Sequence, residues 1–132
     1  MFKIVWLLKR KEGMTHAQFR EHFERSHAPM AQRYVGHLLC EYRRNYLSEI
    51  GFGGGPRPEG LGYHLREWGR DLLSEWVMPN EAAFNEVMRI MTEPRTLKEF
   101  QEDSAKFSDQ KATVMLHCAV VDRDAGEGHA AL

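Results

Sequence analysis

The sequence predicts an α+β fold in which a four-stranded antiparallel sheet carries helices on one face. Strand-like and helix-like segments follow one another in the order β-α-β-β-α-β, which is the order of ferredoxin-like domains. At 132 residues the chain is long enough to bury one core of its own. Two of the expected strands carry apolar side chains on both sides. We therefore expect a single domain whose open sheet face is covered by a second copy, as a homodimer.

The first strand and the start of the first helix follow from local signals. Residues 2–9 (FKIVWLLK) are rich in β-branched and aromatic side chains, which favour a strand. Thr15 is followed three residues later by Gln18, and this pair predicts a capping box at a helix N-terminus. Phe19 and Phe23 then lie four residues apart, as the buried stripe of an amphipathic helix requires.

His27 continues this apolar stripe, four residues after Phe23. Pro29 follows two residues later, and its ring both removes a backbone donor and clashes with the preceding turn. We expect Pro29 to kink the helix or to end it near Ala28. The imidazole of His27 then faces the sheet next to an open helix end.

The middle of the chain contains two expected strands, residues 38–47 and 71–78, on either side of a long Gly- and Pro-rich segment. We expect one domain over residues 1–123, a loop insertion at about 48–70, and a flexible tail over 124–132. A loop of this length is typically a functional cover or a disordered insertion, and its aromatic residues favour a cover.

The second half of the chain adds helices and the closing strand. Asn80 is the expected N-cap of a helix. Pro94 opens a further short helix with Leu97 and Phe100 facing inward, and residues 112–121 form the last strand. The buried stripe of the helix after Asn80 consists of Phe84, Val87, Met88 and Met91.

Composition restricts the partners that this chain is expected to bind. Eighteen Lys and Arg are scattered among nineteen Asp and Glu, so no basic face is expected for nucleic acid or an anionic membrane. No apolar run approaches the roughly 20 residues of a membrane span, and the first charges follow the apolar run, unlike a secretory signal. Cys40 and Cys118 lie in expected strands, and we interpret both as buried, reduced thiols of a cytoplasmic protein.

Five short motifs, in order along essentially the whole chain, resemble those of one family. They are KRKEGM at residues 9–14, Phe19 with HAP at 27–29, YxxN at Tyr42 and Asn45, Trp76, and DxxxFxD at Asp103, Phe107 and Asp109. This pattern is similar to the EthD family, named for a protein of ethyl tert-butyl ether degradation clusters, within the dimeric α+β barrel superfamily. Val77 stands where the family usually has an aromatic residue, and the segment 53–70 is longer than expected.

The resemblance implies cofactor-independent chemistry on a small, largely apolar carbonyl or aromatic compound. Proteins similar to this chain include dehydratases, enzymes that modify aromatic polyketides, and isomerases. We therefore expect a lyase or isomerase of a catabolic or polyketide-type pathway, without a cofactor. Two alternatives stay open: a non-catalytic small-molecule-binding accessory protein for an oxygenase system, and a cofactor-free monooxygenase.

His27 is the first candidate for this chemistry, because an imidazole that titrates near neutrality suits proton abstraction next to a carbonyl. The alternative is a satisfied core histidine. Tyr42 and Asn45 lie three apart on a strand and so face opposite sides. The family pattern favours Tyr42 as hydroxyl donor to a developing enolate oxygen, unless it only packs at a sheet edge.

Asp109 is the third catalytic candidate, as acceptor for a ring nitrogen of His27 or for a loop amide, although a turn residue is the plainer interpretation. The histidines do not form a metal site, because His22 and His27 lie about 140° apart around a regular helix. Heme bound through His64 or His117 is a further alternative, and an arginine, Arg57 or Arg66, could hold a substrate carboxylate. The expected substrate-binding residues are Phe23, Asn45, His64, Arg66 and Trp76.

Overall fold

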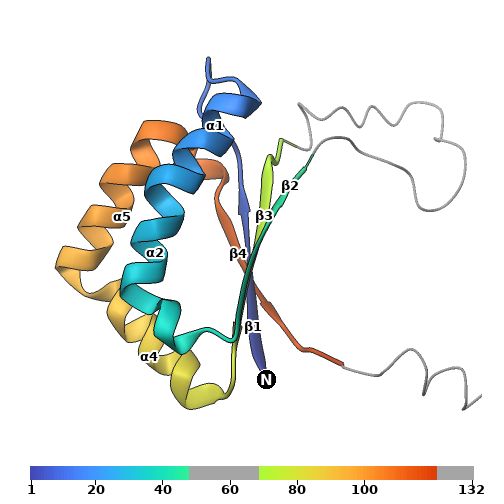
Figure 1. The fold of residues 1–132 in the computed structure, drawn as a ribbon, viewed down its shortest axis with the longest axis vertical. Helices are drawn as coiled ribbons and strands as arrows, with labels where there is room; N and C mark the ends of the chain where they lie inside the picture. The colour runs from blue at the N-terminus through green and yellow to red at the C-terminus, as the bar shows by residue number, and fades with distance from the viewer. Residues whose placement is uncertain (48–68, 122–132) are drawn as a thin grey trace, which may run out of the picture.

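The computed structural model describes residues 1–47 and 69–121, and these form a four-stranded sheet with helices on one face (Figure 1). Neighbouring strands pair antiparallel in the order β2-β3-β1-β4. This confirms the predicted ferredoxin-like fold. The strands are β1 (Phe2–Leu8), β2 (Glu41–Tyr46), β3 (Leu72–Met78) and β4 (Val114–Cys118).

The helical layer lies on the opposite side of Figure 1 from the open sheet face, with α5 next to the α1–α2 helical stretch. Thr15 caps α1 in the predicted capping box, and Asn80 caps α4 through a hydrogen bond from Ala83 N. The helix that begins at Pro94 is not short, since it continues to Phe107. The helical elements are α1 (His16–His22), η1 (Phe23–His27), α2 (Ala28–Val35), η2 (Gly36–Leu38), α4 (Glu81–Thr92), α5 (Pro94–Phe107) and η3 (Gln110–Ala112).

The first helix does not end near Ala28, because one π-helical turn, η1, joins α1 to α2 in front of Pro29. The N–H of Ala28 bonds to the carbonyl of Phe23, five residues earlier, instead of four. A proline inside a regular helix would lose one bond and clash with the carbonyl four residues back. The wider π turn avoids this clash. Pro29 therefore stands at the start of α2, and the chain stays helical to Val35.

The register of the sheet decides which side chains face the helices. Trp6 is paired with Ser74, and Tyr42 with Trp76, so these four share one face. Asn45 is paired with Leu73, on the other face. Since successive side chains alternate, a shift by one residue would exchange the two sets.

Two apolar clusters fill the space between sheet and helices. One surrounds Val35 and Val87 under α2 and α4, and the other joins Phe19, Phe23 and Phe107 between η1 and α5. Trp6 and Tyr42 pack against both clusters. These two aromatic residues therefore mark the boundary where a cavity opens.

Three details of the fold differ from expectation. The second and last strands are shorter than predicted at both ends, so Cys40 precedes β2, and it is exposed instead of buried. Leu97, which was expected to face inward, is 40% exposed. Residues 48–68 and 122–132, most of the expected insertion and the tail, lie outside the described part of the chain. Within the described part, no helix is long and apolar enough to span a membrane.

Candidate active site

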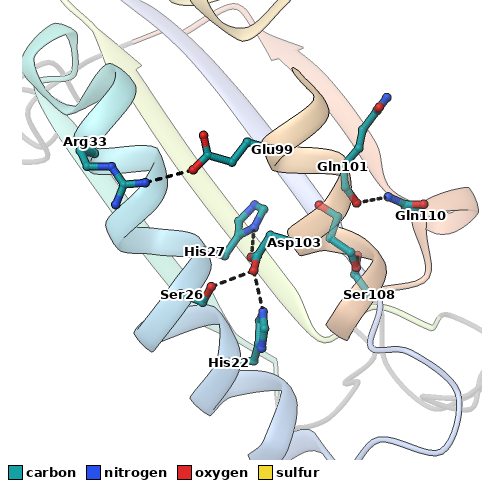
Figure 2. A network of polar contacts seen from close by, with 10 residues as sticks. His22, Ser26, His27, Arg33, Glu99, Gln101, Asp103, Ser108 and Gln110 are labelled. Atoms are coloured by element: carbon teal, nitrogen blue, oxygen red, sulfur yellow. Dashed lines mark hydrogen bonds and ion pairs between the residues drawn. The ribbon is translucent and has the colours of Figure 1, made fainter. Parts of the chain in front are cut away.

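Asp103 on α5 gathers three side chains from the facing helix (Figure 2). Nδ1 of His27 lies 2.8 Å from Oδ2 of the carboxylate, while Nε2 of His22 lies 3.0 Å from Oδ1. The hydroxyl of Ser26 donates to the same Oδ1 at 2.7 Å. The side chains of His27 and Asp103 are only 13% and 9% exposed. This is a largely buried carboxylate whose two oxygens both accept hydrogen bonds.

The π turn explains how His22 and His27 reach the same carboxylate. In a regular α-helix, two residues five apart point about 140° away from one another, which is why the sequence predicted that they could not share a metal ion. Here the i→i+5 turn of η1 separates them and brings both rings onto the side of Asp103. The 140° angle used in that prediction does not hold here, since the helix is not regular.

Hydrogen bonding keeps Asp103 ionised. Burial by itself raises the pKa of this carboxyl group, but the hydrogen bonds from His27, Ser26 and His22 outweigh burial, so the pKa lies well below its ordinary value. Because the carboxylate only accepts, the proton of the neutral His27 ring resides on Nδ1. Nε2 of His27 then has a free lone pair, and it has no hydrogen-bond partner among the described residues.

His27 lines a cavity of about 170 Å³ between the sheet and the helices. Phe23 and Phe100 pack against its ring, with ring centroids 5.1 and 5.4 Å away. The wall is largely apolar, with a few hydroxyl, amide and indole groups. Besides His27, the described residues that line it are Trp6, Leu8, Phe23, Tyr42, Ser74, Trp76, Met91, Leu97, Phe100, Gln101, Ser104 and Thr113.

Tyr42 contributes a phenol to the sheet side of the cavity. Burial raises its pKa well above the ordinary value, and the guanidinium of Arg44, 4.8 Å from the ring centroid, only partly opposes this. The hydroxyl therefore stays protonated around neutral pH. A protonated, partly desolvated hydroxyl is a hydrogen-bond donor suited to a developing oxyanion.

The predicted site residues separate into three groups. His27, Tyr42, Phe23 and Trp76 line the same cavity. Asn45 does not, because it faces the open side of the sheet, where its amide donates to Leu73 O and Glu75 at 3.0 Å. His64 and Arg66, like Arg57, lie outside the described residues.

Asp109 is not the partner of His27. Its carboxylate accepts from the backbone N–H of Lys111 and so caps η3, which is the loop-amide alternative. It lines a separate, larger and more polar pocket together with Arg10 and Asp71. His117, the candidate heme ligand, is exposed on β4 with its ring against Phe84.

Asp103 is the residue that sequence reasoning missed as a site residue, although it begins the DxxxFxD motif. One signal could have revealed it: it lies three residues after Phe100 and four before Phe107, on the buried stripe of α5. A carboxylate in such a position needs partners. No group of three or more His, Cys, Asp or Glu side chains in the described ranges is arranged to hold a metal ion.

Comparison with known families agrees with this architecture. A model of the EthD domain matches residues 11–111. The chain belongs to the EthD family. Within this family, the motifs that carry Phe19, His27 and Asp103 all fall inside the matched segment. A comparison with curated proteins finds no match.

Solved structures share the fold of this EthD domain at low sequence identity. An EthD family protein from Bacillus halodurans C-125 is 17% identical, with 92% of this chain and 100% of that one covered and a TM-score of 0.57. An EthD-like protein from Ralstonia eutropha JMP134 is also 17% identical, covering 95% and 96%, with a TM-score of 0.59. A protein from Arabidopsis thaliana is 14% identical over 94% and 99%, also with a TM-score of 0.59. At such identities the likeness concerns the fold alone.

Proposed function

We propose that this protein is a cofactor-independent lyase or isomerase, which moves a proton on a small, largely apolar carbonyl or aromatic compound of a catabolic or polyketide-type pathway. The observation that carries the proposal is the His27–Asp103 pair at the wall of an apolar cavity. The site includes the groups that such a reaction needs: one base, His27, oriented by the carboxylate of Asp103, and one phenol, Tyr42.

The base is Nε2 of His27. It removes a proton from the carbon next to the substrate carbonyl, and the electron pair of the broken C–H bond moves onto the carbonyl oxygen as an enolate. The imidazolium that forms is stabilised by Asp103, which also holds the ring in the tautomer with a free Nε2. Asp103 thus acts through His27, as a positioning residue.

The enolate oxygen accepts a hydrogen bond from the hydroxyl of Tyr42, in the role of an oxyanion hole. In the isomerase reaction the imidazolium returns its proton to a different carbon. In the lyase reaction the enolate collapses, the C–O bond to a β-hydroxyl breaks, and the proton of His27 joins the leaving hydroxide as water. Both routes leave His27 neutral and require no oxidant or reductant.

The apolar wall strengthens these interactions. Charges that form in a site of low polarity interact more strongly than in water, because fewer water dipoles screen them. Phe23 and Phe100 contact the His27 ring directly. The same wall disfavours substrates with many polar groups.

Solvent exchange measured by proton NMR tests this function. Chelator-treated protein is incubated in D₂O with a panel of lactones, β-hydroxy ketones and phenolic ketones, beside the His27→Gln and His16→Gln variants. We expect deuterium incorporation or product with the parent and with His16→Gln, and neither with His27→Gln. Equal activity in all three proteins would contradict the role of His27, and activity that stops under argon would identify the oxygen-dependent alternative.

We also propose a cytoplasmic homodimer, packed through the open face of the sheet. Apolar side chains of β1, β3 and β4 lie on that face, including Leu7, Leu73 and Leu116, the last of which is 45% exposed. Burial of such a surface favours association. Sedimentation velocity at micromolar concentration should give a dimer, with the monomer favoured in Leu116→Lys. A parent protein that sediments as a monomer would refute the proposal.

A further inference from the structure

The sheet side of the cavity contains buried indole N–H groups without an acceptor. The Nε1 atoms of Trp6 and Trp76 are both buried and have no hydrogen-bond partner in the part of the chain that the structure describes. Trp76 is only 5% exposed. Buried polar groups are nearly always paired in folded proteins, because an unpaired donor loses its bond to water without replacement. Both residues line the cavity, while their Nε1 atoms have almost no accessible surface. A bound molecule can therefore supply the missing acceptor once the indole shifts toward the cavity.

Trp76 lies next to Tyr42, so the indole N–H and the phenol hydroxyl can donate to the same ligand atom. The two residues are directly paired in the sheet, and their rings meet edge to face with centroids 6.0 Å apart. A carbonyl oxygen has two lone pairs and so accepts two hydrogen bonds. One phenol and one indole on neighbouring strands match this requirement.

The volume of the cavity limits the size of the ligand. A cavity of about 150 Å³ lined by apolar side chains is large enough for benzene. The cavity here measures about 170 Å³, which leaves room for one six-membered ring and a short substituent. A fused two-ring ketone adds four ring carbons to this ligand, and close-packed walls resist such an increase in size.

The charge of the lining limits the ligand further. Among the described residues that line the cavity there is no Lys, Arg, Asp or Glu. Asp103 is adjacent but stands behind His27, to which it is bonded. A carboxylate or phosphate would therefore lose its hydration without gaining a cation. An uncharged oxygen acceptor fits this lining.

We infer that the cavity binds an uncharged, single-ring carbonyl compound whose oxygen accepts a hydrogen bond from the indole N–H of Trp76 beside the hydroxyl of Tyr42. The inference rests on the proposed function only in taking this cavity as the substrate site. It makes Trp76 a specificity-determining residue, because the N–H distinguishes a carbonyl from a hydrocarbon of the same shape.

Isothermal titration calorimetry with four probes tests the inference. Acetophenone has one ring and one carbonyl, ethylbenzene has the same shape without the oxygen, benzoate adds a charge, and 2-acetonaphthone adds a ring. We expect acetophenone to bind about five- to tenfold more tightly than ethylbenzene, which corresponds to one net hydrogen bond. Benzoate and 2-acetonaphthone should bind more weakly than acetophenone.

The matched variant is Trp76→Phe, which keeps an aromatic ring and removes the N–H. We expect its preference for acetophenone over ethylbenzene to fall below about twofold. The larger cavity of the variant affects both probes alike, because they have the same shape, so the ratio of their affinities isolates the N–H. An unchanged preference in Trp76→Phe would overturn the inference. So would a parent protein that binds ethylbenzene or benzoate as tightly as acetophenone, or that binds none of the four probes.

Exchange of the acetophenone methyl hydrogens with D₂O, followed on the same samples, keeps the two proposals separate. Selective binding without exchange would contradict the proton-transfer function and leave the binding inference intact. Exchange that is abolished in His27→Gln, together with equal binding of acetophenone and ethylbenzene, would support the proton-transfer function and contradict the binding inference.

Discussion

In the described part of the chain, two carboxylates, Asp103 and Asp71, pair with histidines of the same helical stretch, and their surroundings differ. His27 lies 2.8 Å from Asp103, with side chains 13% and 9% exposed. His16 lies 3.1 Å from Asp71, and its side chain is 37% exposed. The buried pair lines an apolar cavity, whereas the other lines a larger, more polar pocket beside Arg10 and further cations.

The comparison shows that the pair alone does not define a site. Asp71 is also bound by the backbone N–H of Arg10 at 2.8 Å, and it connects the end of β1 with the start of β3. That role is structural. Asp103 instead receives side-chain donors and leaves one nitrogen of His27 unpaired beside the cavity. Burial and the apolar lining of the adjacent cavity distinguish the proposed catalytic pair from the other one.

The largest expected effect is on turnover in the His27→Gln variant. Loss of a positioned general base lowers a rate by about 10²- to 10⁴-fold, so deuterium exchange should decrease by that factor. His16→Gln is the matched control in the other pair and should stay within about twofold of the parent. Exchange rates from proton NMR check both values. A similar loss of deuterium exchange in His27→Gln and His16→Gln would show that the two pairs do not differ in function.

A somewhat smaller effect is expected from Asp103→Asn. The amide keeps the shape of the side chain but loses the charge that stabilises the His27 imidazolium, so kcat should fall on the order of 100-fold with little change in KM. Asp71→Asn, the counterpart in the exposed pair, should leave kcat unchanged. Steady-state kinetics would contradict the positioning role of Asp103 if KM rose while kcat remained at the parent value.

Acid stability provides a third test of the buried pair. The folded-state pKa of Asp103 lies below its ordinary value of 3.8, so its ionised form stabilises the fold above that pH. This contribution is lost as the pH falls from about 3.8 through the lower folded-state value. The free energy of unfolding should therefore decline more steeply with acidification in the parent than in Asp103→Asn.

Urea unfolding followed by circular dichroism, repeated between about pH 2 and 7, measures these slopes. Glu102→Gln controls for the loss of one carboxylate at a neighbouring, exposed position on α5. Parallel curves for the parent and Asp103→Asn would show that the carboxylate is not stabilised by its partners.

The smallest expected effect is that of Ser26→Ala. This change removes one of the three side-chain donors to Asp103, and a net hydrogen bond to a charged acceptor contributes about 1.5–3 kcal/mol. His22 and His27 keep their bonds, so turnover should fall only a fewfold. Thermal unfolding measures the loss of stability in this variant, and exchange rates measure its loss of turnover. A loss of turnover as large as that of Asp103→Asn would mean that Ser26 takes part in the chemistry.

Local signals were sufficient for the order of elements and for several boundaries. The capping box at Thr15 and the N-cap at Asn80 act within three residues, so they can be recognised without knowledge of the fold. The apolar stripe that runs from Phe19 to His27 was visible for the same reason. Its orientation toward the sheet follows from the hydrophobic effect, which acts on any amphipathic helix.

The candidate site was only partly predictable. Alternation along β2 required Tyr42 and Asn45 to face opposite sides. Which of them faces the cavity depends on the register with β3, where Tyr42 is paired with Trp76. The register depends on both strands, which are about 30 residues apart in the chain, so it cannot be deduced from the sequence of β2 alone.

The sequence by itself determined the elements, the fold class and the position of His27 on a buried stripe. Only the tertiary structure decided its partner, because Asp103 is 76 residues away and approaches through helix packing. It also decided the π turn at Phe23–His27, where Pro29 excludes regular hydrogen bonding and packing against α5 favours the wider form. Periodicity encodes which face of an element is buried, whereas contacts between elements depend on the summed packing of the whole core.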